Sequence, residues 1–264
     1  MLIDFHTHAF EDTLAAKAIP FLEEEGHIQA ATDGRTSSLI AAMDRAGIDR
    51  SVICPIATKP THFDGIRRWA RKVRTQEPRL EMLLSVHPDD PEALAHIDQT
   101  AAEGFKGLKF HPYYQKFVLD DERLFPLYER IAARGLLAVF HTGFDIAYPP
   151  ERICDPIRIR HVIDTFPTLK LVATHLGGWR DWENSRTYLI GRPVYIETSF
   201  CLHEMPPAEA RAMILDHAPG YILFGTDSPW SDQTEELARW HALGLPDDVL
   251  AAALGGNAAR LLQG

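Results

Sequence analysis

Residues 2–8 read LIDFHTH, an apolar run that ends in two histidines one residue apart. The apolar residues favour a strand, in which successive side chains point to opposite faces. His6 and His8 are therefore expected on one face of that strand, together with Asp4. Two imidazoles so placed are close enough to share one ion, although unrelated polar residues at the end of a strand give the same pattern. The remaining sequence has to decide between these interpretations.

The same pattern of a short apolar run followed by a polar residue occurs seven more times. The predicted strands are 2–8, 50–56, 80–88, 104–112, 135–143, 168–178, 193–200 and 221–230. Helix-like stretches lie between and after them, near 37–46, 62–76, 91–102, 121–134, 155–166, 179–189, 206–218, 231–243 and 246–262. Alternating strands and helices indicate βαβ units with a parallel sheet. Eight such units in 264 residues predict one α/β domain over 1–264, a (β/α)8 TIM barrel.

Local signals support individual helices. In SSLIAAMDRAG, Ser37 or Ser38 is the expected N-cap and Gly47 ends the helix. Pro126 suits the first turn of the helix near 121–134. Segment 9–36 is too long for a simple connection, and we expect it to form a helix broken at Pro20. In a barrel, this insertion would lie over the active-site mouth and act as a lid.

Composition narrows the function classes. The chain has 27 basic and 37 acidic side chains, a net charge of −10, which argues against nucleic-acid binding and against an anionic membrane surface. Its three cysteines are widely spaced, as expected of reduced thiols. No apolar run approaches the length of a membrane span, and the first residues do not resemble a signal peptide. We therefore expect a cytoplasmic protein that acts on a small molecule.

Polar side chains gather where the predicted strands end. They are His6 and His8, His87, Lys109 and His111, His141, His175, Glu197, and Asp227. Because barrel active sites lie at the C-terminal ends of the strands, these groups should converge on one mouth. Imidazoles suit zinc and other transition metals, and a carboxylate adds an anionic ligand. The sequence therefore predicts a divalent-metal site, with zinc as the favoured ion.

Taken in order, the motifs DFHTH, GLKFHP, FHTG, ATHLGG, FGTDSPW and GGNAARLL resemble the amidohydrolase superfamily, in its amidohydrolase 2 branch. That branch holds metal-dependent hydrolases and the decarboxylases related to aminocarboxymuconate semialdehyde decarboxylase. The resemblance implies that His6, His8 and His141 are metal ligands. It implies that Asp227 binds the metal and acts as general base. His175 would bind a second metal or, with one metal, orient the water or polarise the substrate.

Lys109 leaves the number of metals, one or two, open. It matches the fourth-strand lysine that is carboxylated and bridges two metals in binuclear relatives. It could equally be an unmodified cation that holds a substrate carboxylate, with His111 beside it. Trp179 and Arg180, which follow the sixth predicted strand, are further candidate substrate-binding residues. The resemblance also leaves a homodimer open.

The chemistry follows from the ligand types. A bound divalent ion lowers the pKa of its water from about 15.7 toward about 7, and Asp227 can take the proton and return it to the leaving group. The leading interpretation is hydrolysis of an amide, ester or lactone. A non-oxidative decarboxylase of an unsaturated or aromatic carboxylate is the alternative. A non-catalytic metal-binding or small-molecule-binding barrel is the alternative from another class.

Residues near the strand ends also have plainer interpretations. Asp4 could fix a histidine tautomer or be an ordinary carboxylate, and Glu197 is expected to point into the barrel in a supporting role. For His87, a structural role is favoured over a substrate contact. Cys54 and Cys201 are expected to be small core residues.

Overall fold

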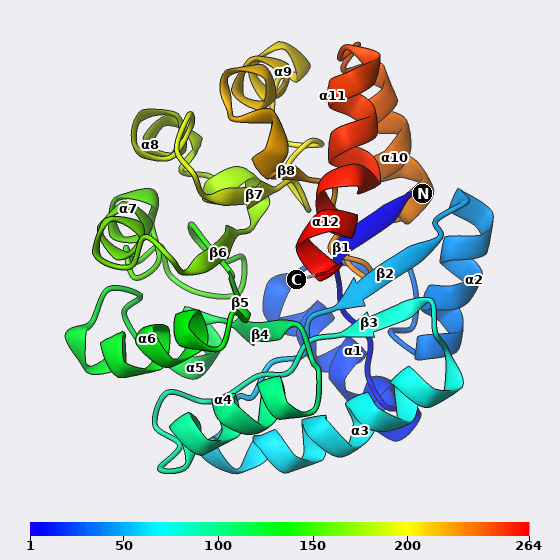
Figure 1. The fold of residues 1–264 in the computed structure, drawn as a ribbon. Coiled ribbons are helices and arrows are strands. Elements are labelled where there is room, and N and C mark those ends of the chain that lie inside the picture. Colours follow the sequence, from blue (N-terminus) through cyan, green and yellow to red (C-terminus); the bar gives the residue numbers. More distant parts are fainter. Residues whose placement is uncertain (264) are drawn as a thin grey trace.

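The computed structural model describes residues 1–263; Gly264, the last residue of the predicted domain, lies outside them. Eight short parallel strands occupy the centre, and helices surround them (Figure 1). The strands are β1 (Ile3–Thr7), β2 (Arg50–Ile53), β3 (Leu80–Met82), β4 (Gly107–Phe110), β5 (Leu137–Phe140), β6 (Lys170–Ala173), β7 (Tyr195–Glu197) and β8 (Ile222–Leu223). Each is shorter than its predicted range, because the ends of those ranges leave the sheet and form loops. The predicted TIM barrel is confirmed.

Backbone hydrogen bonds at two seams join the three-stranded set β1–β3 and the five-stranded set β4–β8. Leu84, just after β3, accepts from the Lys109 amide at 2.8 Å and donates to Gly107 at 3.0 Å. At the second seam, Phe5 donates to Phe224 at 2.8 Å, and the Asp227 amide donates to the His6 carbonyl at 2.8 Å. The second seam therefore places the polar ends of the first and last strands side by side.

The helices follow the predicted order. They are α1 (Asp12–Gly26), α2 (Thr36–Ala46), α3 (Phe63–Gln76), α4 (Ala93–Ala102), α5 (Pro112–Gln115), α6 (Phe125–Ala133), α7 (Pro156–Thr165), α8 (Trp182–Tyr188), α9 (Pro207–Asp216), α10 (Gln233–Ala242), α11 (Asp247–Ala251) and α12 (Asn257–Gln263). Short 3-10 turns lie at 60–62, 122–124, 175–177 and 219–221, and a π turn at 252–256 joins α11 to α12.

Two local predictions about helix ends differ in outcome. Pro126 lies in the first turn of α6, and Gly47 ends α2 in a left-handed conformation, both as predicted. The N-cap of α2 is Arg35 rather than a serine, because the backbone becomes helical already at Thr36. Arg35 makes no side-chain hydrogen bond that caps this helix.

Buried apolar side chains form two clusters. The larger fills the layer between the strands and the surrounding helices. The smaller lies inside the barrel, where Ile3 and Phe5 of β1 meet inward-facing residues of other strands and the side chains of Leu261 and Leu262 from α12. The barrel interior is therefore packed, and open space remains beyond the C-terminal ends of the strands.

Strand β1 contains an irregularity that reverses the expected side-chain pattern. Asp4 pairs with Ser51 and Thr7 pairs with Ile53, so three steps along β1 span two steps of β2. The extra residue breaks the alternation of side chains. As a result, Asp4 points toward Gln233 of α10, with 2.7 Å between Asp4 Oδ2 and Gln233 Nε2, and not toward the histidines. The prediction that Asp4 shares the face of His6 and His8 was wrong.

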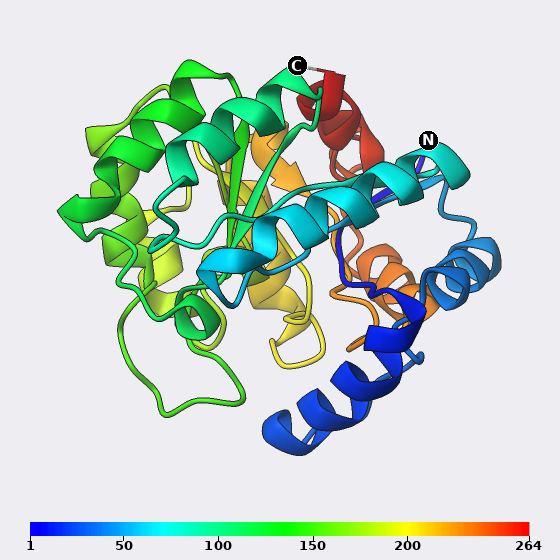
Figure 2. The ribbon, with the colours of Figure 1, turned by 90° about the horizontal axis from the view of Figure 1, so that it is seen from below.

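Segment 9–36 projects from the barrel at the end where the polar strand ends lie, with α1 at its outer edge (Figure 2). Contrary to prediction, α1 runs unbroken through Pro20. A proline removes one helical hydrogen bond and can be absorbed as a bend when the other bonds persist. The Phe10 amide donates to the Gly34 carbonyl at 2.8 Å and ties the two ends of the segment together.

Three further observations bear on the sequence predictions. Cys54, Cys154 and Cys201 are all buried free thiols. The His87 ring accepts from the Asp89 amide at 3.1 Å, so this histidine shapes its own loop. None of the helices within residues 1–263 is long and apolar enough to cross a bilayer.

Candidate metal centre and active site

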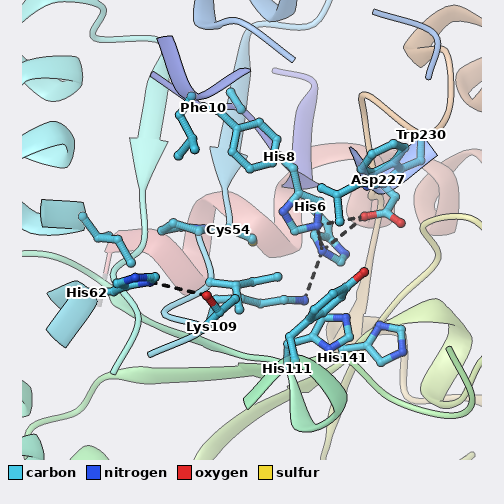
Figure 3. Close-up of a pocket in the computed structure, with 18 of the residues that line it drawn as sticks. His6, His8, Phe10, Cys54, His62, Lys109, His111, His141, Asp227 and Trp230 are labelled. Carbon is cyan, nitrogen blue, oxygen red and sulfur yellow. Dashed lines mark hydrogen bonds and ion pairs between the residues drawn. The ribbon is translucent and has the colours of Figure 1, made fainter. Parts of the chain in front are cut away.

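A cavity of about 600 Å³ opens at the C-terminal ends of the strands. Its inner end holds polar residues from five strand ends, those of β1, β4, β5, β6 and β8. Figure 3 shows His6, His8 and Asp227 on one side of this end and His111 and His141 on the other. The predicted site residues that line the cavity are His6, His8, Lys109, His111, His141, His175, Trp179 and Asp227. Residues from segment 9–36, among them Phe10, Leu14 and Leu22, form part of the outer wall.

Three donor atoms converge at the junction of β1 and β8. The Nε2 atoms of His6 and His8 lie 3.2 Å apart, and Asp227 Oδ1 lies 3.5 Å from the first and 3.1 Å from the second. Asp227 Oδ1 is fully enclosed and accepts no hydrogen bond from residues 1–263. Ligand atoms at about 2.0–2.1 Å from a tetrahedral ion are about 3.3–3.4 Å apart, so this donor set fits a divalent metal.

Glu197 fixes the ring of His6. Its Oε1 lies 3.0 Å from His6 Nδ1 and also accepts from the Ser199 hydroxyl at 2.7 Å. A carboxylate only accepts, so Nδ1 carries the proton and the lone pair of His6 is on Nε2, facing His8 and Asp227. Gly225 makes this possible, because a Cβ there would lie 2.1 Å from Glu197 Oε2. The expectation that Glu197 points into the barrel is met.

Charge and burial leave these groups ready to bind a cation. Burial, reinforced by Lys109, holds the pKa of His6 well below its usual value, so the ring is neutral. Burial acts to raise the pKa of Asp227, but the imidazoles of His6, His8 and His175 outweigh it and hold that pKa well below its usual range. Asp227 is therefore an ionised carboxylate beside the neutral ring of His6, and both groups are in the form that binds a metal.

Lys109 completes this half of the site. Its Nζ lies 3.1 Å from His6 Nε2, and the side chain is 1% exposed. Burial lowers the pKa of the amine, although the carboxylates of Asp227 and Glu197 oppose that effect. Within residues 1–263, no carboxylate oxygen lies within 4.0 Å of Nζ. Within the described residues, Lys109 is thus a buried lysine without a salt bridge next to the candidate metal ligands.

A second donor group lies across the cavity and comprises His111, His141 and Asp145. The rings of His111 and His141 stack at 4.1 Å, and Asp145 Oδ2 lies 3.4 Å from His111 Nε2. The fifth-strand histidine predicted as a ligand therefore belongs to a different donor group from His6, His8 and Asp227. Burial holds the pKa values of both histidines well below the usual value.

His175 connects the two groups. Its Nδ1 donates to the Ser199 carbonyl at 2.9 Å, and His141 Nε2 donates to the Phe144 carbonyl at 2.9 Å. Carbonyls only accept, so the facing atoms, His175 Nε2 and His141 Nδ1, both present lone pairs at 3.0 Å. Two lone pairs so close suit a shared cation. His175 and Asp227 also have left-handed backbones, with φ of 56° and 65°, strained conformations that are common at functional sites.

The sequence analysis did not predict Asp145 as a site residue. It predicted Arg180 as a substrate-binding residue, and the structure places Arg180 elsewhere. Asp145 follows His141 by four residues in the loop after β5, so loop position was the available signal. Trp179 is 3% exposed and lines the cavity. Arg180 is half-exposed, bonds Glu204 at 2.7 and 2.8 Å, and is not part of the cavity wall. The structure thus brings Trp179, but not Arg180, into the site.

The fold and this donor set define a metal-dependent barrel enzyme. The chain belongs to the amidohydrolase family, whose model matches residues 3–264. A dihydroorotase from Pseudomonas fluorescens is 25% identical over 167 residues, 58% of this chain. The match covers 48% of that protein, so it spans about half of its length.

Solved structures share the fold. A 5-carboxyvanillate decarboxylase from Sphingomonas paucimobilis has a TM-score of 0.74 at 20% identity, covering 99% of this chain and 98% of that one. An uncharacterised TIM-barrel protein from Bordetella bronchiseptica has a TM-score of 0.76 at 20% identity, with the same coverage. A dihydroxybenzoic acid decarboxylase from Polaromonas with bound manganese has a TM-score of 0.74 at 16% identity, covering 99% and 96%.

Proposed function

We propose that the protein is a metal-dependent hydrolase that cleaves an amide, ester or lactone bond of a small molecule. Lys109 is the observation that carries this proposal. A buried amine with a lowered pKa and no salt bridge is nucleophilic, and it can add CO2 to give a carbamate and a proton. The carbamate would add an anionic ligand between His6 and the donors across the cavity. The partial likeness to a dihydroorotase also supports hydrolysis.

His6, His8 and Asp227 would hold one ion, and His141 and His175 would hold a second beside a carboxylated Lys109. When bound, divalent ions supply a Lewis acid and lower the pKa of a water molecule. Zinc suits the imidazole ligands, whereas some proteins of this fold bind manganese.

Asp227 has the role of proton carrier. Its Oδ1 accepts no well-aligned hydrogen bond within residues 1–263, so it can accept the proton of the attacking water. It then returns that proton to the nitrogen or oxygen of the leaving group as the acyl bond breaks. Glu197 and Ser199 keep His6 and His175 in fixed tautomers during these steps.

The shape of the cavity suggests a substrate with an apolar part. Beyond the polar inner end, its walls include Phe10, Ile56, Trp69, Trp179 and Phe200. Such a wall favours an aryl or alkyl group over a sugar or a polyanion. A small molecule of this kind is the partner we propose.

Decarboxylation of an aromatic carboxylate is the second candidate. The aromatic wall favours it, and so do the barrel structures named above, two of which are decarboxylases of aromatic acids. In that case Lys109 would remain an ammonium ion and pair with the substrate carboxylate. The two candidates thus differ in the chemical state of one side chain.

The test is to purify the protein without chelators, with and without 13C-bicarbonate, and to measure metal equivalents and the carbon NMR spectrum. Hydrolysis predicts two equivalents and a carbamate signal that disappears in Lys109→Met and persists in Lys106→Met, the matched control. One equivalent with no carbamate, together with CO2 release from aromatic carboxylates, would establish the second candidate instead.

A further inference from the structure

Tyr114 is a cavity residue without a role in the chemistry described so far. It lies on α5, directly after β4, which carries Lys109. Its ring packs edge-on against His111 at 4.5 Å and against Tyr148 at 5.4 Å. These two contacts position the ring, and with it the hydroxyl oxygen, at the cavity wall.

The hydroxyl of the partly buried Tyr114 differs from those of the buried Tyr113 and Tyr128. Tyr113 donates to the Glu151 carbonyl at 2.6 Å, and Tyr128 donates to the Leu119 carbonyl at 2.6 Å. The Tyr114 hydroxyl makes no hydrogen bond to any residue in 1–263, and it is not among the polar atoms that the protein fully encloses. A fixed donor that remains free at the wall of a cavity is available to a ligand.

The surroundings of the hydroxyl keep it a donor. Burial raises the pKa of Tyr114, and the carboxylates of Asp145 and Asp227 raise it further. The phenol therefore stays protonated across the working pH range and cannot serve as a base. Figure 3 shows His111, beside which Tyr114 packs, across the cavity from Asp227 and His8.

We propose that Tyr114 is a catalytic residue that donates a hydrogen bond to the oxygen of the substrate carbonyl as that oxygen becomes negative. This inference rests on the proposed hydrolase function. As the water oxygen bonds to the carbonyl carbon, the π electron pair moves onto the carbonyl oxygen. The Tyr114 proton stays on the phenol, and its hydrogen bond strengthens until the leaving group departs with its electron pair.

The experiment compares Tyr114→Phe with Tyr113→Phe in the metal-loaded protein. Phenylalanine keeps the ring contacts of Tyr114 and removes only the hydroxyl, and unchanged melting temperature checks the fold. Two readouts are taken: hydrolysis of 4-nitrophenyl acetate, and calorimetric binding of phenylphosphonate, an aryl tetrahedral anion. Loss of one oxyanion donor costs about 10²–10³ in kcat.

We expect Tyr114→Phe to lower kcat about 100-fold with KM little changed, and to weaken phenylphosphonate binding at least tenfold. Tyr113→Phe should lower the melting temperature and leave phenylphosphonate affinity unchanged, because its hydroxyl holds backbone. Equal affinity in Tyr114→Phe and wild type, or no binding to wild type, overturns the proposal. If the wild-type protein cleaves no ester but its affinity for phenylphosphonate still depends on the Tyr114 hydroxyl, the proposed hydrolase function is wrong and the role of Tyr114 as a hydrogen-bond donor is kept.

Discussion

Two aspartates lie on opposite sides of the seam between β1 and β8, and their environments differ. Asp227 is 8% exposed on the cavity side and is surrounded by three imidazoles, which hold its pKa well below the usual range against the effect of burial. Asp4 is fully buried on the helix side, among Thr226 and Gln233. Burial raises the pKa of Asp4 to about 7, although these hydrogen bonds oppose the shift.

The comparison shows that burial alone does not determine the pKa or the role of a carboxylate. Neighbours that can carry positive charge, or share a cation, keep Asp227 ionised, and Oδ1 accepts no well-aligned hydrogen bond within residues 1–263. Around Asp4, hydroxyl and amide donors only partly replace the hydrogen bonds of water, so burial still raises its pKa. Its hydrogen bonds connect β1 to the loop after β8 and to α10. Glu197 belongs to the cavity side, and Glu236 of α10, with a pKa raised to about 7 by burial, belongs to the helix side.

The largest effect is expected from Asp227→Asn. Loss of the charged ligand and proton acceptor should lower kcat by about 10³-fold, because general-base catalysis contributes about 10²–10⁴. Steady-state kinetics and metal analysis measure it, with Asp4→Asn as the control, which should retain its metal and most of its activity. Equal losses of metal in Asp227→Asn and Asp4→Asn would contradict the conclusion that only the aspartate on the cavity side binds metal.

Glu197→Gln should have the next largest effect. A neutral amide holds the His6 Nδ1 proton less well than a carboxylate, so metal affinity should fall about 10–100-fold. Competition with a chromogenic chelator measures the affinity. Glu236→Gln, a matched change on the helix side, should leave the affinity unchanged, and a similar loss in both variants would exclude a specific role for Glu197.

The pH dependence of stability tests the helix side. Glu236 has a folded pKa of about 7, above its unfolded value of 4.5, so the folded state binds more protons between these pH values. Stability should therefore fall as pH rises from about 4.5 to 7, by roughly 2–3 kcal/mol from this group. Urea denaturation of metal-free protein at pH 5 and pH 8 should show that this fall shrinks in Glu236→Gln. Glu235→Gln, at an exposed neighbour, should keep the wild-type slope, and a wild-type slope in Glu236→Gln would refute the assignment.

The smallest effect is expected where solvent reaches the charges. Arg180 pairs with Glu204 outside the cavity, and exposed ion pairs contribute about 0–1 kcal/mol. Arg180→Ala should therefore change KM less than twofold and stability by less than about 1 kcal/mol. A large rise in KM, measured with the same substrate as for wild type, would restore the substrate-binding role predicted for Arg180.

Much of the fold could be predicted from local sequence. The eight apolar runs, the intervening helices, Gly47 and Pro126 all have the expected structural place, because periodicity and local backbone preference act over a few residues. The continuous helix α1 and the N-cap of α2 could not be predicted from local sequence, because they depend on the contacts of the whole segment 9–36 with the rest of the protein.

By itself, the sequence determined which side chains end each strand, and therefore that His6, His8, Lys109 and Asp227 would meet at one mouth. Only the tertiary structure decided which of them touch. The extra residue in β1 turned Asp4 away from the histidines, the seam with β8 brought Asp227 Oδ1 to 3.1 Å from His8, and α5 placed Tyr114 in the cavity wall. These outcomes depend on strand register and on contacts between residues from different elements, up to more than two hundred positions apart, which local patterns do not encode.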